Sequence, residues 1–313
     1  MAEPQALPGD LSPPVLVYDR IAANKRQTWF MMFVFVAFIG GFATVIALAF
    51  GLPVTFAPVV FVALAIYASI SYYVSSSVAL AVSSAHPVSK EDEPELYRVV
   101  ENLAIGSGLP MPKVYVIEDS APNAFATGRD PKHASVTATR GLLDKLDHNE
   151  LEAVIAHEIS HVGNYDIRVM TITVVLVGLV ALLADFFLRW TWFGAGRRRS
   201  NDDRGGQLQL LIFAVAIVLA LLAPIAAQLI QLSISRKREY LADASGALLC
   251  RNPDALARAL EKISADPEPL EVANKATAHL YFSNPLREHQ SFLNNLFSTH
   301  PPVEERIRLL RAM

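Results

Sequence analysis

The chain has 313 residues, of which 52% are hydrophobic and 18% charged, and its formal net charge at pH 7 is −3. This balance is too apolar for an ordinary soluble protein, and it offers no excess of positive charge for binding nucleic acid. Cys250 is the only cysteine, so an intrachain disulfide is excluded and any metal must be held by nitrogen and oxygen ligands.

Two long apolar runs dominate the N-terminal part of the chain. Residues 1–28 are polar and rich in proline, so we expect a flexible segment there. Residues 29–50 and about 58–82 contain no charged residue, and each run is long enough to cross a bilayer core of about 30 Å. A cleaved signal peptide is the competing interpretation, but the first run is too long for one and the second follows at once. We therefore predict a transmembrane hairpin.

The composition changes at residue 83 to that of a soluble domain. Residues 93–103 have the pattern of an amphipathic helix, which we expect to end at the glycines that begin with Gly106. Alternating and β-branched residues then predict three strands, over residues 112–118, 123–128 and 134–139. A helix that begins near Asn149 should follow them.

Two more apolar runs interrupt the second half of the chain. They cover residues 169–188 and 208–232, and Pro224 should kink the second of them. The soluble segments carry 22 of the 27 basic residues, which places those segments in the cytoplasm. Five arginines between the two later runs argue the other way. Either the early spans set the orientation, or the later runs form a hairpin that does not fully cross.

The pattern His157-Glu158-x-x-His161 is the strongest chemical signal in the chain. Its flanks are good helix formers without glycine or proline, and residues four apart on a helix share one face. The two imidazoles should therefore converge on one metal ion. Glu158 can then take the proton of a metal-activated water. The alternative is a helix with two surface histidines and a solvated glutamate.

A catalytic zinc usually has a third protein ligand, and Glu239 is our candidate. It stands just after the fourth apolar run. Asp243 lies one helical turn further on the same face, where it can accept the free ring N–H of a ligating histidine. The alternative is a solvated basic helix beside a membrane surface. These residues alone leave both interpretations open.

Four segments together resemble the HtpX-type membrane zinc metalloproteases, distant relatives of the CAAX prenyl endoproteases. They are PNAFATG at 122–128, HEISHVGNYD at 157–166, SRKREYLAD at 235–243, and LFSTHPP at 296–302 followed by Glu305-Arg306-Ile307. The resemblance covers nearly everything from residue 29 onward. It implies that His157, His161 and Glu239 bind one Zn²⁺ per subunit and that Glu158 is the catalytic base. Tyr165 is a departure, because the family usually has glycine there.

The resemblance also implies the fold class. We expect an α+β protein: a mainly helical zincin-like metalloprotease domain with a small β-sheet, plus four predicted transmembrane helices. The division is a flexible segment over 1–28, a transmembrane hairpin over 29–82, a first part of the protease domain with the HExxH helix over 83–168, a hydrophobic hairpin over 169–232, and a second part with the third zinc ligand over 233–313.

Three further candidates have two interpretations each. His300 either donates a hydrogen bond to the tetrahedral oxyanion as a catalytic residue or only positions a turn. Arg306 serves either the oxyanion or, as we favour, an ion pair with Glu304 or Glu305. The third candidate is a strand at Asn123, Ala124, Phe125, Ala126 and Thr127. It is either a sheet edge to which substrate adds as a further strand or an ordinary central strand.

The expected function is a membrane-bound zinc metalloendopeptidase at the cytoplasmic face of the cell membrane. Eight residues separate His161 from the third apolar run, so the zinc should lie within roughly 10–15 Å of the spans. Expected partners are the lipid bilayer and misfolded or damaged membrane proteins as substrates, with no nucleic acid and an oligomeric state left open. The rivals are a four-span scaffold or transporter with an incidental metal site, and a catalytically inactive relative.

Overall fold

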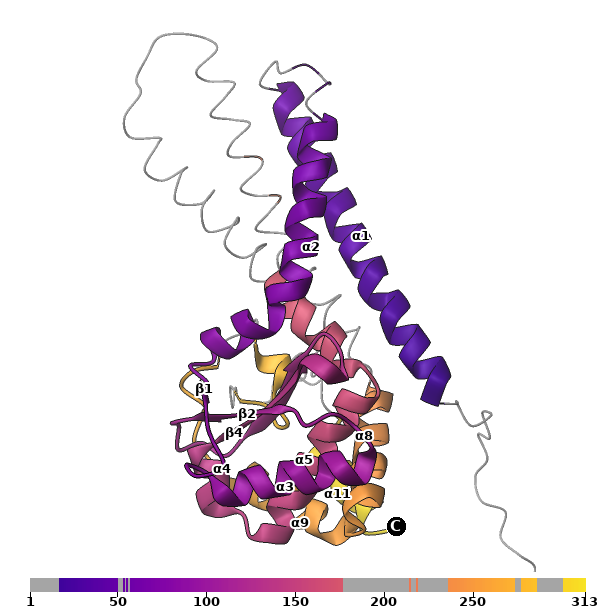
Figure 1. Ribbon diagram of the computed structural model, residues 1–313. Helices are drawn as coiled ribbons and strands as arrows, with labels where there is room; N and C mark the ends of the chain where they lie inside the picture. Colours follow the sequence, from indigo (N-terminus) through magenta and orange to yellow (C-terminus); the bar gives the residue numbers. More distant parts are fainter. Residues whose placement is uncertain are drawn as a thin grey trace, which may run out of the picture.

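A long helical hairpin projects from one end of a body built from a small sheet and shorter helices (Figure 1). The computed structural model describes residues 17–49, 53, 55, 57–176, 214, 218, 236–273, 277–285 and 301–313. The hairpin consists of α1 (Val17–Ala49) and α2 (Ala57–Val82). Two of the predicted spans are thus helices that pack together.

Among the described residues, one helix, α2, is long and apolar enough by length and composition to cross a membrane. Most of its outward side chains are apolar, and Val59 (63%), Val62 (58%) and Ile70 (56%) remain mostly exposed. The four transmembrane helices that we predicted are therefore not established. Apart from residues 169–176, 214 and 218, the third and fourth apolar runs lie outside the described residues.

The helix α1 begins twelve residues before the apolar run from which we predicted it. Residues 17–28, which we expected to be flexible, form its first turns. The reason is that they contain no glycine or proline and are held against the body: Asn24 is 4% exposed and Thr28 is 1% exposed. Composition alone suggested disorder, and tertiary contacts decide otherwise.

The sheet has four strands in the order β1-β2-β4-β3. β2 (Lys113–Ile117) and β4 (Ala134–Thr139) are parallel, and β3 (Ala124–Gly128) pairs with β4 antiparallel at one edge. The three strands predicted from the sequence are present with ends that differ by no more than one residue. The two-residue strand β1 (His86–Pro87) was not predicted.

Within the described residues, the body also contains the shorter helices α3 (Pro94–Ser107), α4 (Arg140–Lys145), α5 (His148–Gly163), α8 (Arg236–Cys250), α9 (Pro253–Ala265) and α11 (Val303–Leu310). Single turns of 3-10 helix occur at Pro131–His133 and Ala278–Leu280. The helix α3 runs to Ser107 and is capped by Gly108, with φ 68°, so it ends within the stretch of glycines that we predicted. Only the residue that caps the helix needs the left-handed conformation.

The helix α5 lies at the centre of the body. Residues on most sides of it are buried, including Leu151, Val154, Ile155 and Ile159, because it packs against the sheet, α3, α8 and α9. A helix that is apolar on all sides belongs in the interior. The histidine-bearing helix is therefore a core element, and its His157, Glu158 and His161 side chains are buried in protein.

The start of the third apolar run is also buried. Residues 166–176 are helical, and Ile172 (1% exposed) and Leu176 (5% exposed) pack in one cluster with Met32 and Phe35 of α1. These contacts fix α1 and α2 to the body. The first residues of this run therefore face protein.

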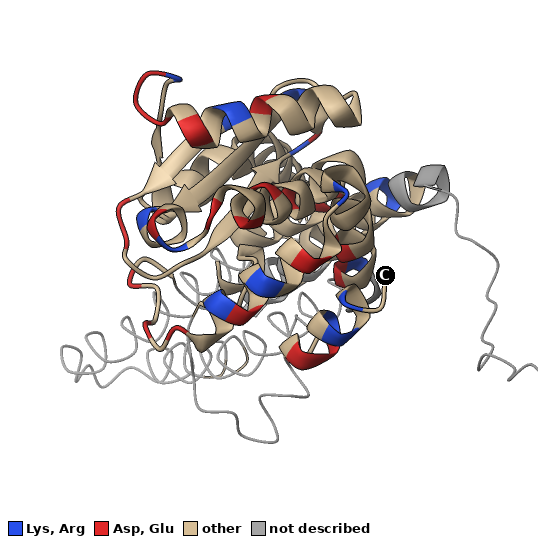
Figure 2. Cartoon of the chain, turned by 90° about the horizontal axis from the view of Figure 1, so that it is seen from below, with Lys and Arg blue, Asp and Glu red and all other residues tan. Residues whose placement is uncertain are grey.

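The outer helices carry a mixture of charges. Figure 2, seen from below, shows Lys and Arg interspersed with Asp and Glu along them. Several of the charged side chains form surface ion pairs, such as Lys90 with Glu101 at 2.7 Å and Arg311 with Glu261 at 2.7 Å. Exposed pairs of this kind add little stability.

Candidate metal centre

The helix α5 brings His157 and His161 together. Their Nε2 atoms lie 3.1 Å apart, and both side chains are buried. The helix starts at a capping box in which Asp147 Oδ1 accepts the Glu150 N–H at 2.9 Å and Glu150 Oε2 accepts the Asp147 N–H at 3.0 Å. This Asp-x-x-Glu signal was available in the sequence and marks the true start of the helix.

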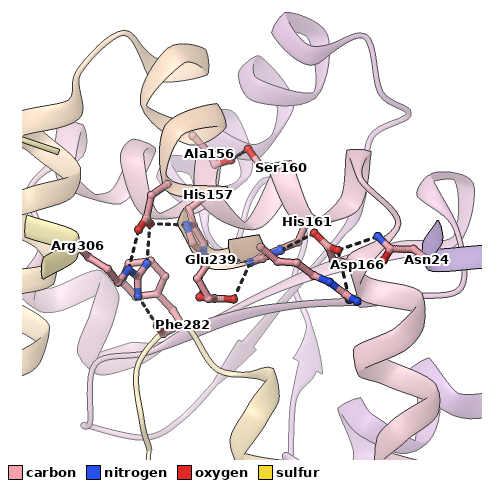
Figure 3. Close-up of polar contacts among 11 residues, drawn as sticks. Asn24, Ala156, His157, Ser160, His161, Asp166, Glu239, Phe282 and Arg306 are labelled. Atoms are coloured by element: carbon pink, nitrogen blue, oxygen red, sulfur yellow. Dashed lines mark hydrogen bonds and ion pairs between the residues drawn. The ribbon is translucent and has the colours of Figure 1, made fainter. Parts of the chain in front are cut away.

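The helix α8 brings Glu239 to the same point. Its carboxylate oxygens lie 3.9 Å from His157 Nε2 and 3.6 Å from His161 Nε2. The two helices approach closely because residue 246 is a glycine: a Cβ there would stand 2.8 Å from the backbone nitrogen of His157. The three predicted ligands are thus gathered by one helix crossing (Figure 3).

The donor set fits a zinc ion. With metal–ligand bonds of about 2.0–2.1 Å, tetrahedral geometry puts two donor atoms about 3.4 Å apart. The two Nε2 atoms, 3.1 Å apart, are close to that value, and the Glu239 carboxylate places one oxygen 3.6 Å from His161 Nε2 and the other 3.9 Å from His157 Nε2. One ligand atom from each of His157, His161 and Glu239 lies within 4.8 Å of the others, and all three residues are buried.

A carboxylate and a guanidinium stand behind His157. Asp243 Oδ1 lies 2.9 Å from His157 Nδ1, and Arg306 donates to both oxygens of Asp243, at 2.7 and 2.8 Å. Burial raises the pKa of Asp243, but the charge of Arg306 and the hydrogen bonds from His157 and Arg306 together outweigh burial and lower that pKa to about 2. The carboxylate is therefore ionised and can accept the ring N–H of His157.

Arg306 forms an ion pair, but the partner that we predicted, Glu304 or Glu305, was wrong. Arg306 is 1% exposed and turns inward toward Asp243 on α8, whereas Glu305 pairs with Arg308 at 2.6 Å on the outer face of α11. Neighbours in sequence on a short helix point in different directions, so the choice of partner depended on how α11 packs.

A second carboxylate stands behind His161. Asp166 Oδ2 lies 3.2 Å from His161 Nδ1, and Asp166 Oδ1 accepts a hydrogen bond from Asn24 Nδ2 at 2.8 Å. Asp166 was not among the predicted site residues. Its position in the segment that begins at His157 was a usable signal, whereas nothing in the sequence pointed to Asn24.

The protonation of the two histidines differs. Burial lowers the pKa of His157 to about 4, so its ring is neutral, as a metal ligand must be. Burial acts the same way on His161, but the hydrogen bond to Asp166 and the charge of Glu239 outweigh it and raise the pKa of His161 to about 9. The surroundings of His161 thus favour a positive charge, which a metal ion would supply.

Glu158 is buried beside this cluster, with 2% of its surface exposed. Burial raises the pKa of Glu158 to about 7, although the charge of His161 and a hydrogen bond from the backbone of Ala126 oppose the shift. A carboxylate with a pKa near 7 is suited to take and return a proton at neutral pH.

The candidate substrate-binding strand lies at the sheet edge, as one of our two interpretations required. Its outward groups are already in use at three points. The Ala124 carbonyl accepts from the Phe282 N–H at 2.8 Å, the Ala126 N–H donates to Glu158, and the Gly128 N–H donates to Thr171 Oγ1 at 3.1 Å. All residues from Asn123 to Thr127 are buried. The other catalytic candidate, His300, lies outside the described residues.

Comparisons with known proteins agree with these residues. The model of peptidase family M48 matches residues 90–313. A protease HtpX homolog of Tropheryma whipplei (strain TW08/27) is 48% identical over 95% of this chain and 99% of its own length. One of Dictyoglomus thermophilum is 46% identical over 96% of both chains.

A solved structure also resembles the chain. The crystal structure of S. mikatae Ste24p has a TM-score of 0.46 and 20% identity, covering 91% of this chain and 66% of that one. The sequence relatives decide the family, since they are close to half identical along nearly their whole length. The chain belongs to peptidase family M48, among the HtpX-type proteases, and is a metallopeptidase that hydrolyses peptide bonds.

Proposed function

We propose that this chain is a membrane-bound zinc metalloendopeptidase that holds one zinc ion per subunit through His157, His161 and Glu239. The observation that carries the proposal is the buried convergence of these three side chains, whose possible ligand atoms lie within 4.8 Å of one another. Two imidazoles and one carboxylate form a donor set that suits a catalytic zinc with an open position.

The surrounding residues prepare both imidazoles for this role. Asp243 lies 2.9 Å from His157 Nδ1, and Asp166 lies 3.2 Å from His161 Nδ1. Each carboxylate can therefore accept a hydrogen bond from an Nδ1–H and leave the Nε2 lone pair to face Glu239. The guanidinium of Arg306 keeps Asp243 ionised in a buried place. Each histidine is thereby fixed in one tautomer and one orientation.

Glu158 moves the proton in the proposed reaction. A zinc ion held by His157, His161 and Glu239 would supply Lewis-acid chemistry, polarising the scissile carbonyl and lowering the pKa of a water molecule. The Glu158 carboxylate takes a proton from that water and returns it to the leaving amine. Its pKa of about 7 suits both directions. We retain His300 as the candidate hydrogen-bond donor to the oxyanion. We also retain residues 123–127 as the candidate substrate-binding strand, along which the substrate backbone would pair beyond Ala124.

We further propose that the enzyme acts at the cytoplasmic face of the cell membrane on misfolded or damaged membrane proteins. The exposed apolar surface of α2 supports the membrane location. The basic residues of the soluble segments support the orientation. The contacts between α1 and the body keep the cleavage site close to the hairpin.

One experiment tests metal binding and proton transfer together. The full chain and its Glu158→Gln variant are purified in detergent under metal-free conditions, and bound zinc and cleavage of casein are measured after zinc is added. Both proteins should bind about one zinc, because Glu158 is not a ligand, and only the wild type should cut. Wild-type cleavage by the variant, or no zinc in either protein, would contradict the proposal.

A further inference from the structure

The first turns of α1 reach into the metal site from outside the protease domain. Asn24 is 4% exposed, and its Nδ2 donates to the Asn164 carbonyl at 2.8 Å and to Asp166 Oδ1 at 2.8 Å. An amide NH₂ has two hydrogens to donate, and both are used here. Figure 3 shows the resulting chain of contacts from Asn24 through Asp166 to His161.

The turn that receives these hydrogen bonds is held in a conformation that its sequence disfavours. Tyr165 has φ 61°, in the left-handed region that a bulky residue rarely adopts. Its ring lies under the ammonium group of Lys25, 4.6 Å from the ring centroid, and near the guanidinium of Arg168 at 5.1 Å. Adjacent residues of α1 thus hold both the backbone and the side chain of this turn.

The same helix also contacts the segment that carries the third ligand. Arg238, which directly precedes Glu239, donates to Gln27 Oε1 on α1 and lies 3.6 Å from Asp166 Oδ1. Asn24 and Gln27 are three residues apart, so they lie on one face of the helix. That face therefore contacts the end of α5 and the first turn of α8.

Attachment of α1 to the body does not require these polar contacts. Met32 and Phe35, further along the helix, are buried in a cluster with Ile172 and Leu176. Apolar contacts of this kind supply attachment without fixing the direction of a distant carboxylate. The hydrogen bond from Asn24 to one oxygen of Asp166 does fix the direction of that carboxylate. The other oxygen of Asp166 is the partner of His161 Nδ1.

We propose that Asn24 is a positioning residue for the metal site. Through Asp166 it sets the orientation of His161, so metal affinity depends on the hydrogen bond that Asn24 donates to Asp166. The inference rests on the proposed zinc site. It implies that a displacement of α1 near Asn24 weakens metal binding without touching any ligand.

The test compares variants of α1 in the full chain, purified in detergent. Asn24→Leu removes the donor at similar size, and Asn24→Asp puts a carboxylate against Asp166. The exposed Lys25→Met variant removes the cation over Tyr165 and does not disturb buried packing. Two controls on the same helix are Arg26→Ala, at an exposed position, and Met32→Ala, which loosens apolar packing only.

Two readouts follow the metal directly: the zinc dissociation constant from competition with a chelator, and the visible absorption spectrum of the cobalt-loaded protein. Asn24→Leu should bind zinc about tenfold more weakly and shift the cobalt bands, as changes behind a ligating histidine do. Asn24→Asp should lose more affinity and Lys25→Met less, while both controls should keep the wild-type affinity and spectrum.

The outcomes separate this inference from the proposed function. If the wild type binds metal and both Asn24→Leu and Lys25→Met match its affinity and spectrum, the positioning role is wrong and the metal site stands. If Met32→Ala weakens binding as much as Asn24→Leu, loosened packing is the cause and the inference fails. If Asn24→Leu does not fold, the test rests on Lys25→Met, and an unchanged zinc affinity and cobalt spectrum in that variant would contradict the positioning role. A wild type that binds no metal overturns both proposals.

Discussion

His157 and His161 differ in what stands behind their rings. His157 has Asp243, whose charge is compensated by the buried guanidinium of Arg306. His161 has Asp166, which is held by the neutral amide of Asn24 and by the more distant Arg238. The His161 side is therefore richer in negative charge, which agrees with the raised pKa of His161. A cation between the two rings would balance that excess.

The pair of Arg306 with Asp243 yields a prediction at the scale of single residues. Arg306→Met keeps most of the side-chain volume but leaves a buried carboxylate without its cation. Removing one partner of a buried pair costs about 3–5 kcal/mol. We expect a loss of that size in the free energy of unfolding, measured by denaturant titration of the detergent-solubilised protein.

The matched control for that variant lies on the same helix. Arg308 pairs with Glu305 at the surface, so Arg308→Met should leave the unfolding transition almost unchanged. Equal effects of the two substitutions would show that the buried pair contributes no more than a surface contact. The role that we give Arg306 in holding Asp243 would then be wrong.

At the scale of elements, the site depends on the crossing of α5 and α8 at Gly246. A methyl group there would stand 2.8 Å from His157 N and 2.9 Å from His157 Cα, both backbone atoms that cannot turn aside. Gly246→Ala should therefore push the helices apart and cost about 1–3 kcal/mol of stability, more than alanine gains by its helix propensity. Because Glu239 would move with α8, zinc binding should weaken as well.

Gly106 provides the control for Gly246. It lies in α3, and a Cβ there would meet only Leu249 Cδ1, at 3.6 Å. Gly106→Ala should stabilise the protein by up to about 1 kcal/mol. Thermal unfolding measures the change in stability of both variants, and zinc titration measures the change in their metal affinity. A Gly246→Ala protein that binds zinc and unfolds like the wild type would contradict the close crossing.

Local sequence patterns predicted the strands and the histidine helix correctly, because alternation and helical spacing involve residues close together in the chain. The partners behind the histidines were harder to predict. Asp243 shares a helix face with Glu239 and was predicted, whereas Asn24 is separated from Asp166 by 142 positions and Arg306 from Asp243 by 63. The packing of the helices decides which distant side chain contacts the carboxylate behind each histidine, and local sequence patterns do not show that packing.

At the scale of the whole molecule, the hairpin and the protease body share one boundary. Aromatic and basic side chains gather where α1 and α2 meet the body: Trp29 stacks on Tyr72, and the guanidiniums of Arg129 and Arg168 lie over Tyr73 and Tyr72. Such residues are frequent at the interface of membrane and water. The proposed membrane surface therefore passes close to the turn that follows the histidine helix.

The proposed orientation can be tested on the intact molecule. In a Cys250→Ala background, single cysteines at Thr55, between α1 and α2, and at Ser89, in the body, report their sides of the membrane; both positions are exposed. A maleimide that cannot cross membranes, added to intact spheroplasts, should label the cysteine at position 55. The cysteine at position 89 should react only after lysis, because the basic soluble segments favour the cytoplasm. The reverse pattern would place the metal site outside the cell and would contradict cleavage at the cytoplasmic face.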